Sequence, residues 1–342
     1  MKERQSNIEL LRIISMFFIV LEHILIMGTD FFTSPIGNQL HIANAIIGFT
    51  YSGVNCFILI TGYFGTNFSY RRLLNLYLIC GIYELVGFVF AYLQGSAEFS
   101  TTALSYIIFP LSRSNTWFIR CYVILLFLLP IINKGIEQLN KKQFTHILIL
   151  LTILNIYFGW FQKHANFNAI GYNPSQMIYL YVIGRYLKTY VDWNTVAKYK
   201  LYVFLLWFLL SFLWGMIQNI NEIMTIPHWN GWAYNNPIIL MSAISFFMFF
   251  RVINIPYSKI INTLGSTMFA VFLIHMNRNI GNHLYIFIKN IIYLPSIEQS
   301  ITIQVLVLIF CAFLIMFVSV LFDLVRIKLF SRYILKDKYN NI

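Results

Sequence analysis

Residues 8–28, IELLRIISMFFIVLEHILIMG, form an apolar stretch long enough to cross the ~30 Å hydrocarbon core of a membrane as one helix. The stretch contains Arg12 and His23, which are 11 residues apart. At about 100° per residue, this spacing places both side chains on one face of the helix, ~16 Å apart along its axis. Ionisable groups within hydrocarbon cost roughly 2.5 kcal/mol or more each and are therefore rare. Arg12 and His23 are the first candidates for a functional site.

The composition is that of a polytopic membrane protein. The chain has 342 residues, of which 59% are hydrophobic and only 11% charged, whereas a soluble domain is about 25% charged. The net charge of +12 comes from basic residues in short loops, where they set membrane topology, so we expect no nucleic-acid partner. The four cysteines lie in apolar runs without a C-x-x-C pair, which predicts buried core residues and no metal site.

Ten stretches of the chain are apolar enough to span a membrane, and together they predict an all-α protein with one transmembrane domain over residues 1–342 and no separate soluble domain. All eight prolines lie in connections or near the ends of the predicted spans, because proline interrupts a helix interior. The predicted spans are 8–28, 46–64, 73–94, 116–132, 144–161, 174–190, 200–218, 237–254, 264–285 and 301–325.

The basic residues predict the orientation of these spans. With the N-terminus inside, four of the 24 Lys and Arg residues lie within spans and three lie in outer connections, so 17 remain for the inner segments and the inner span ends. This bias is typical of membrane proteins, whose cytoplasmic loops are rich in Lys and Arg. It predicts an even number of spans with both termini in the cytoplasm. The three outer residues are Arg113, Lys163 and Lys289.

Further candidates lie on the inner half of the predicted bundle and on its first helix. Glu22 is adjacent to His23 but points ~100° away on the helix, so we expect it to orient a neighbouring group or to hold a proton. Arg71 and Arg72 open the third span at its inner end. They are explained either by the positive-inside bias or by a phosphate clamp, because the guanidinium matches phosphate geometry.

Two pairs of polar residues, each spaced i, i+3, occur near the outer side. Trp117 and Arg120 lie on the fourth predicted span, and His275 and Arg278 lie toward the outer end of the ninth. Tryptophan at this depth often belongs to an interfacial belt, whereas arginine needs a partner. The second pair is a candidate to line the same cavity as His23.

The outer segment 227–236, PHWNGWAYNN, is both aromatic and rich in amides. Its Trp229 and Trp232 suit the apolar faces of a sugar ring, and its asparagines suit the hydroxyl edges. The alternative is an interfacial aromatic belt. The sequence leaves both interpretations open.

Taken together, these residues resemble the membrane-bound acyltransferase family 3, whose bacterial members O-acylate envelope glycans. Arg12-x10-His23 is similar to the signature of the family's first helix, in the form found in low-GC Gram-positive bacteria. A departure is that some members carry an R-x-x-R pair in the first inner connection, where this chain has only the adjacent Arg71 and Arg72. The other matching segments are NIELLRIISMFFIVLEHI (7–24), YSGVNCFILITGYF (51–64), TWFIRCYVILLFLLPIIN (116–133) and FAVFLIH (269–275).

The resemblance implies a multi-pass enzyme of a bacterial plasma membrane that moves an acyl group, expected to be acetyl, from acyl-CoA to a surface glycan or lipid-linked oligosaccharide. Acetyl-CoA would be a co-substrate, with no bound cofactor and no metal. His23 would act as general base or as an acyl carrier, and Arg12 would bind the donor phosphates. A secondary transporter or glycan flippase is the alternative, because intramembrane Arg and His also line transport pathways. The oligomeric state stays open.

Overall fold

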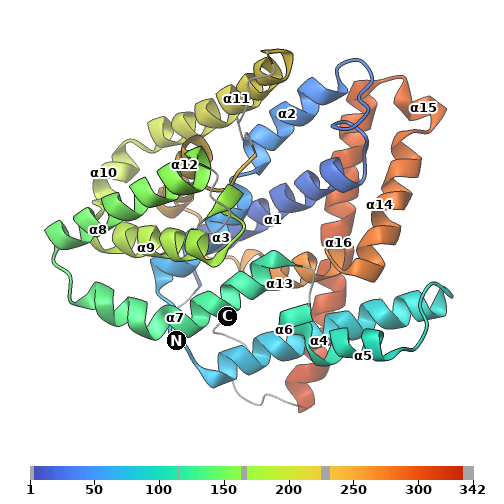
Figure 1. Ribbon diagram of the computed structural model, residues 1–342, viewed down its shortest axis with the longest axis horizontal. Coiled ribbons are helices and arrows are strands. Elements are labelled where there is room, and N and C mark those ends of the chain that lie inside the picture. The colour runs from blue at the N-terminus through green and yellow to red at the C-terminus, as the bar shows by residue number, and fades with distance from the viewer. Residues whose placement is uncertain (1–3, 114–115, 163–167, 225–231, 334–342) are drawn as a thin grey trace. The chain divides into compact units, whose positions relative to one another are not determined.

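The computed structural model describes residues 4–113, 116–162, 168–224 and 232–333 (Figure 1). Every regular element among these residues is a helix, which confirms the all-helical class. Seven helices are long and apolar enough to cross a membrane, and a bent pair makes an eighth candidate. The protein is therefore polytopic.

The helices form two compact units, each assembled from separate parts of the chain. Unit one comprises Met1–Ala43, Leu74–Asn115 and Ile255–Ile342, and unit two comprises Asn44–Leu73 and Thr116–Asn254. Helices α2 (Gln39–Thr50) and α4 (Tyr70–Leu93) contribute residues to both. Unit one further holds α1 (Ser6–Met27), α5 (Thr101–Ile108), α6 (Pro110–Arg113), α13 (Lys259–His275), α14 (Arg278–Ile292), α15 (Pro295–Glu298) and α16 (Ile301–Tyr333). Unit two holds α3 (Gly53–Phe64), α7 (Trp117–Glu137), α8 (Lys141–Ile153), η1 (Leu154–Phe161), η2 (Ala169–Gly171), α9 (Pro174–Tyr190), α10 (Trp193–Lys198), α11 (Lys200–Met224) and α12 (Pro237–Val252).

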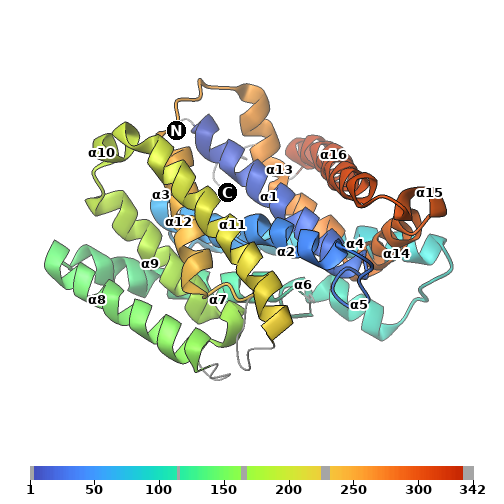
Figure 2. The ribbon, with the colours of Figure 1, turned by 90° about the horizontal axis from the view of Figure 1, so that it is seen from above.

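The core of unit one is the first helix packed against two helices from the far end of the chain. Helix α1 contacts both α13 and α16, and those two contact each other; Figure 2 shows the three side by side. In unit two, α3 packs against α9 and α12, while α11 packs along α12. Each unit therefore buries its polar groups between helices that are distant in the sequence.

Side-chain caps define where many of these helices begin. Asn140, Asn173, Asn236 and Ser258 each precede a helix and accept a hydrogen bond from a backbone N–H of its first turn. Such caps satisfy donors that have no partner within the helix. Because hydrocarbon offers no water to these groups, the caps fix the helix ends.

The ten predicted spans all have helical counterparts, although not all are single long helices. The second predicted span is α2 followed by α3, and the fifth is α8 continued by the π-helical η1. The sixth and eighth correspond to α9 and α12, which have 17 and 16 residues. Pro130 lies inside α7, so the prediction that every proline is near a span end was wrong there, because α7 continues beyond residue 132. The orientation and the single-domain arrangement stay predictions.

The prediction of one straight helix over residues 264–285 was wrong. Helix α13 ends at His275 and α14 begins at Arg278, with a bend of 82° between them. Asn277 causes the break, since its side chain accepts hydrogen bonds from the N–H groups of Asn279 and Ile280 and so starts a new helix. Its amide also donates to the Tyr83 carbonyl of α4 at 3.2 Å. A short polar side chain thus turns the chain immediately after His275.

A buried charged cluster ties α16 to α4 within unit one. Asp323 is 1% exposed, and it accepts hydrogen bonds from Tyr83 at 2.7 Å and from Arg326 Nε at 2.5 Å. An ionised carboxylate without such partners would be strongly unfavourable in hydrocarbon. Sequence analysis did not identify this cluster, because its residues come from helices 240 positions apart.

The close contact between α3 and α9 in unit two depends on two glycines. A β-carbon at Gly62 of α3 would overlap the Tyr181 carbonyl oxygen of α9, and one at Gly184 of α9 would overlap the backbone of α3 at Leu59. Small residues allow two backbones to approach closely in a membrane, where dispersion contacts drive helix association.

We predict that Gly62→Leu lowers the free energy of unfolding by about 1–3 kcal/mol, because the added side chain forces α3 and α9 apart. Unfolding of the detergent-solubilised protein by heat or denaturant measures this change. The control is Gly135→Leu in α7, where an added β-carbon meets nothing within 4 Å. Equal loss of stability in both variants would contradict the close-approach explanation.

Candidate functional site

Two histidines from opposite ends of the chain meet within unit one. The Nδ1 atom of His23 on α1 is 3.0 Å from the Nε2 atom of His275, the last residue of α13. His275 is completely buried and His23 is partly exposed. The ring of Phe272 packs edge-on against His275 at 5.9 Å between centroids. The structure therefore brings His23 and His275 into hydrogen-bonding contact. That they line one cavity stays a prediction.

The hydrogen bonds of this pair determine which ring nitrogens carry protons. The Nδ1 atom of His275 is 2.6 Å from the Val271 carbonyl oxygen, and a carbonyl can only accept, so Nδ1 of His275 is protonated. A neutral imidazole has one N–H, which leaves Nε2 of His275 as an acceptor for Nδ1–H of His23. The remaining nitrogen, Nε2 of His23, then has a free lone pair.

This arrangement gives His23 the properties of a base. Its imidazole is oriented by a hydrogen bond on one nitrogen, while the other can take up a proton. Catalytic bases are commonly oriented by a third group in this manner. In the described part of the chain, no group of three or more His, Cys, Asp or Glu residues is arranged to hold a metal ion.

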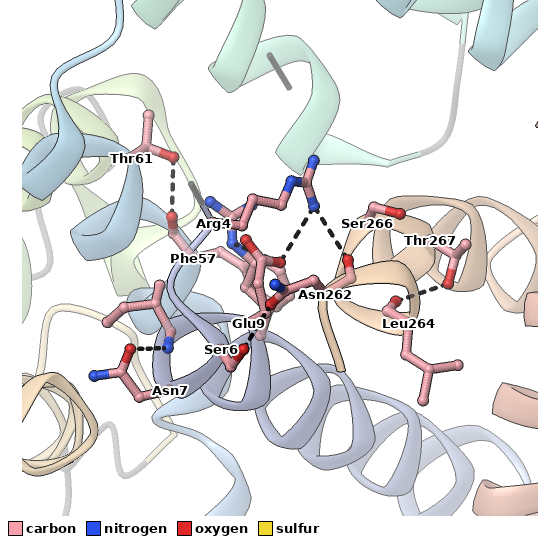
Figure 3. Close-up of polar contacts among 12 residues, drawn as sticks. Arg4, Ser6, Asn7, Glu9, Phe57, Thr61, Asn262, Leu264, Ser266 and Thr267 are labelled. Carbon is pink, nitrogen blue, oxygen red and sulfur yellow. Dashed lines mark hydrogen bonds and ion pairs between the residues drawn. The ribbon is translucent and has the colours of Figure 1, made fainter. Parts of the chain in front are cut away.

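Arg12, the other candidate on α1, shares a buried carboxylate with a second arginine. Glu9 is 6% exposed, and its Oε2 atom lies 3.8 Å from Arg12 Nε and 3.5 Å from Arg4 Nη1. Figure 3 shows Arg4 reaching both Glu9 and the backbone of Asn262 on α13. These three side chains, two cations and one anion, together carry a formal charge of +1.

The same junction anchors the start of α1 to the start of α13. The Ser6 hydroxyl donates to the Asn262 side-chain oxygen at 3.1 Å (Figure 3). It also accepts a hydrogen bond from the Ser258 N–H at 2.8 Å. Because α1 is one continuous helix from Ser6 to Met27, this anchor also sets the position of His23 three turns beyond Arg12.

Arg278 and Glu22 are the remaining candidates of unit one. Arg278 does not continue the face of His275, because the helix breaks between them; its guanidinium lies 3.5 Å from the Tyr106 ring centroid and interacts with the charge of Glu84. The predicted i, i+3 pairing was therefore wrong. Glu22 is buried at 2% exposure on α1, and its catalytic role stays a prediction.

The arginines expected to bind a donor in unit two differ in their surroundings. Arg71 is exposed at the start of α4. Arg72 is partly buried and donates a hydrogen bond to the Asn67 carbonyl in the loop before α4. That bond fixes Arg72 against the connection between α3 and α4.

Trp117 and Trp232 belong to one aromatic cluster in unit two. We define this cluster as Tyr51, Trp117, Tyr172, Trp232 and Tyr234. The Tyr51 and Tyr234 rings are stacked at 4.5 Å, and Trp117 lies 4.7 Å from Tyr172. Tyr51 and Tyr234 are buried, whereas Tyr172 is 36% exposed and both tryptophans are partly exposed. The cluster thus offers a ring surface supported by two buried tyrosines.

Arg120 and Trp229 were also predicted as candidates to contact an acceptor. Arg120 is exposed one turn after Trp117 on α7. Trp229 lies outside the described residues.

A buried amide network beneath the aromatic cluster was missed by the sequence analysis. Asn55 and Gln176 both donate to the Tyr234 carbonyl at 2.9 Å. These two hydrogen bonds hold the Tyr234 backbone in place. They also give its buried carbonyl the partners that a buried polar group requires. The only signal in the sequence was the unusual number of amides between residues 155 and 236. The network comprises Asn55, Asn155, Asn168, Gln176 and Asn235.

Comparison with known proteins identifies one family. The model of acyltransferase family 3, described as an acyltransferase domain, matches residues 5–324. The matched region includes the histidine pair, the Glu9 junction and the aromatic cluster. No curated protein and no solved structure matched the chain.

We predict that His275→Leu changes the protonation pattern of His23, because it removes the acceptor for the His23 Nδ1–H. Imidazole ¹⁵N chemical shifts of histidine-labelled protein should show Nδ1–H for His23 in the wild type and lose that preference in the variant. His283→Leu is the control, since His283 is exposed. A wild-type His23 protonated on Nε2 would contradict the assigned network.

Proposed function

The chain belongs to acyltransferase family 3, and from that premise we propose that it is a membrane O-acyltransferase that uses a cytoplasmic acyl-CoA. The acyl group is expected to be acetyl, and the acceptor is a hydroxyl of a cell-surface glycan or lipid-linked oligosaccharide. The family match and the apolar helices support an acyltransferase within a membrane. The proposed location is a bacterial plasma membrane.

The observation that carries this proposal is the hydrogen bond between His23 and His275. His23 Nε2 takes the proton of the glycan hydroxyl as its oxygen attacks the thioester carbonyl carbon. The new C–O bond forms, the C–S bond breaks, and the proton on His23 passes to the departing thiolate. A positioned base of this kind typically contributes 10²–10⁴-fold to the rate.

The first helix also suits a donor that approaches from the inner side. Arg12 lies on the same face of α1 as His23, ~16 Å away along the axis. An extended pantetheine arm has about this reach, so phosphates near Arg12 would leave the thioester near His23. The formal charge of +1 around Glu9 favours an anion there.

The aromatic cluster supports a glycan acceptor. The partly exposed rings of Trp117, Tyr172 and Trp232 present apolar surface of the type that packs against sugar C–H faces, and Arg120 is exposed beside them. A hydroxyl-rich ligand gains both from such rings and from nearby polar groups.

A transporter or glycan flippase was the alternative function from the sequence. The family match favours acyl transfer over transport without chemistry. Two routes of transfer stay open, because a free lone pair on His23 serves a general base and a covalent acyl carrier equally well.

We predict that His23→Gln reduces acyl transfer by about 10²-fold or more, because no base remains at that position. The assays are release of the CoA thiol by purified protein and the O-acyl content of the polysaccharide by NMR. His283→Gln, an exposed histidine of the same unit, should retain activity. Undiminished O-acylation by the His23 variant in the membrane would refute the assignment.

We predict that Arg12→Ala raises the KM for acyl-CoA by roughly tenfold or more and leaves the KM for the acceptor unchanged, because a charge-assisted contact to a phosphate is lost. Arg12→Lys should give an intermediate value. Steady-state kinetics with each substrate varied in turn provide the measurement. A change confined to the acceptor KM would show that Arg12 does not serve the donor.

A further inference from the structure

A buried tyrosine hydroxyl of unit one has no hydrogen-bond partner among the residues that the structure describes. This hydroxyl belongs to Tyr285 of α14, which is 6% exposed. Buried polar groups without partners are unfavourable, and native proteins contain few of them. By contrast, the hydroxyls of Tyr83 and Tyr293 in the same unit are both hydrogen-bonded. Packing between the helices therefore does not explain why position 285 carries a hydroxyl.

Tyr285 lies on the part of α14 that packs against the end of α13. A β-carbon at Gly281 would lie 2.6 Å from the His275 carbonyl oxygen and 3.6 Å from Cε2 of Tyr285. Side chains of a helix point back toward its N-terminus, and α14 begins at Arg278, directly after the turn that follows His275. The Tyr285 hydroxyl, which is attached next to Cε2 on the ring, is therefore directed toward the end of α13.

The same face of α14 also reaches the end of α1. A β-carbon at Gly28, the residue that caps α1, would lie 3.4 Å from a methyl group of Ile288. Ile288 follows Tyr285 by three residues, so the two side chains are neighbours on one helix face. Tyr285 thus lies between the contact of α14 with His275 and its contact with the end of α1. The histidine pair joins these same two helices, five residues before Gly28 on α1.

Polar contacts hold α14 in this position. The Asp30 carboxylate, just after α1, pairs with Lys289 Nζ at 2.7 Å, and the Asp30 N–H donates to the Tyr293 hydroxyl at 2.8 Å. At the other end, Asn277 caps the first turn of α14. Because both ends of α14 are anchored, the Tyr285 hydroxyl has a fixed position relative to the histidine pair.

The reaction proposed for His23 requires a hydrogen-bond donor that has not yet been assigned. Attack on a thioester carbonyl places negative charge on the carbonyl oxygen, and a donor fixed in advance, such as a tyrosine hydroxyl, stabilises that charge. His23 accepts a proton at this moment and so cannot serve. The Arg278 guanidinium lies over the Tyr106 ring, and Arg12 is ~16 Å from His23 along α1.

We propose that the Tyr285 hydroxyl donates a hydrogen bond to the oxyanion that forms during acyl transfer at His23. This inference rests on the proposed function. As the acceptor oxygen bonds to the carbonyl carbon, the π electron pair moves onto the carbonyl oxygen, and Tyr285 donates to that oxygen while keeping its own proton. The C=O bond then re-forms, the C–S bond breaks, and the proton held by His23 passes to the thiolate.

The test is Tyr285→Phe, which removes the hydroxyl and keeps the ring. The kcat for release of the CoA thiol by the full chain in nanodiscs should fall by about 10²-fold, because one oxyanion donor is lost. The KM values for donor and acceptor should stay unchanged, since the hydrogen bond strengthens only in the transition state. The midpoint of thermal unfolding should stay the same or rise, because the hydroxyl that is removed has no partner in the described chain.

Two other tyrosines of unit one provide matched controls. Tyr257→Phe, at an exposed position, should equal the wild type in kcat and in unfolding midpoint. Tyr83→Phe removes a hydrogen bond of 2.7 Å to the buried Asp323 carboxylate, so its unfolding midpoint should fall. Assayed below that midpoint, Tyr83→Phe should retain the wild-type kcat. Only Tyr285→Phe is thus expected to lose activity without losing stability.

Two results would overturn the assignment of Tyr285. A wild-type kcat in Tyr285→Phe would show that the hydroxyl meets a buried water and takes no part in the reaction. An unfolding midpoint lowered as far as that of Tyr83→Phe would show that the hydroxyl stabilises the fold. Either result in the presence of an active wild type leaves the proposed function intact, whereas a wild type that releases no CoA thiol would refute that function and this inference with it.

Discussion

The hydrogen bond between His23 and His275 is the interaction on which the proposed chemistry depends. It joins residues 252 positions apart and places one imidazole so that only its Nε2 lone pair is available. The bond exists because α13 stops at His275, and α13 stops there because Asn277 starts a new helix. An isolated histidine on α1 would have no fixed tautomer.

The other buried polar groups of unit one show how hydrocarbon constrains the fold. Glu9 is placed between two arginines, and Asp323 is bound by Tyr83 and Arg326. Each carboxylate is neutralised where water is scarce, and each joins a helix to another part of the unit. Removing one member of such a group leaves an uncompensated charge, which destabilises a buried site by several kcal/mol. The polar groups proposed to meet substrates and the polar groups that join helices therefore follow the same rule, because a buried charge needs a partner.

In unit two, neutral contacts join helices to one another. Amide side chains hold the Tyr234 carbonyl, and glycines let α3 and α9 approach closely. The aromatic cluster rests on this framework, which fixes the positions of its partly exposed rings. Three cations of the unit lie instead at the end of α3, where Arg251 and Lys188 contact Tyr63 and Arg185 lies against Gly65.

The sequence by itself determined the helical class and the approximate spans, and it singled out Arg12 and His23 as candidates. These follow from local rules, since hydrophobic length and helical periodicity do not depend on distant residues. Only the tertiary structure decided that His275 is the partner of His23, that Arg278 is not, and that Glu9 is shared by two arginines. It also assembled Asp323 with Tyr83 and the cations around the α3–α4 loop. The physical reason is that polar groups in a membrane are stabilised by partners from other helices, and a linear pattern shows that a partner is needed without showing which residue provides it.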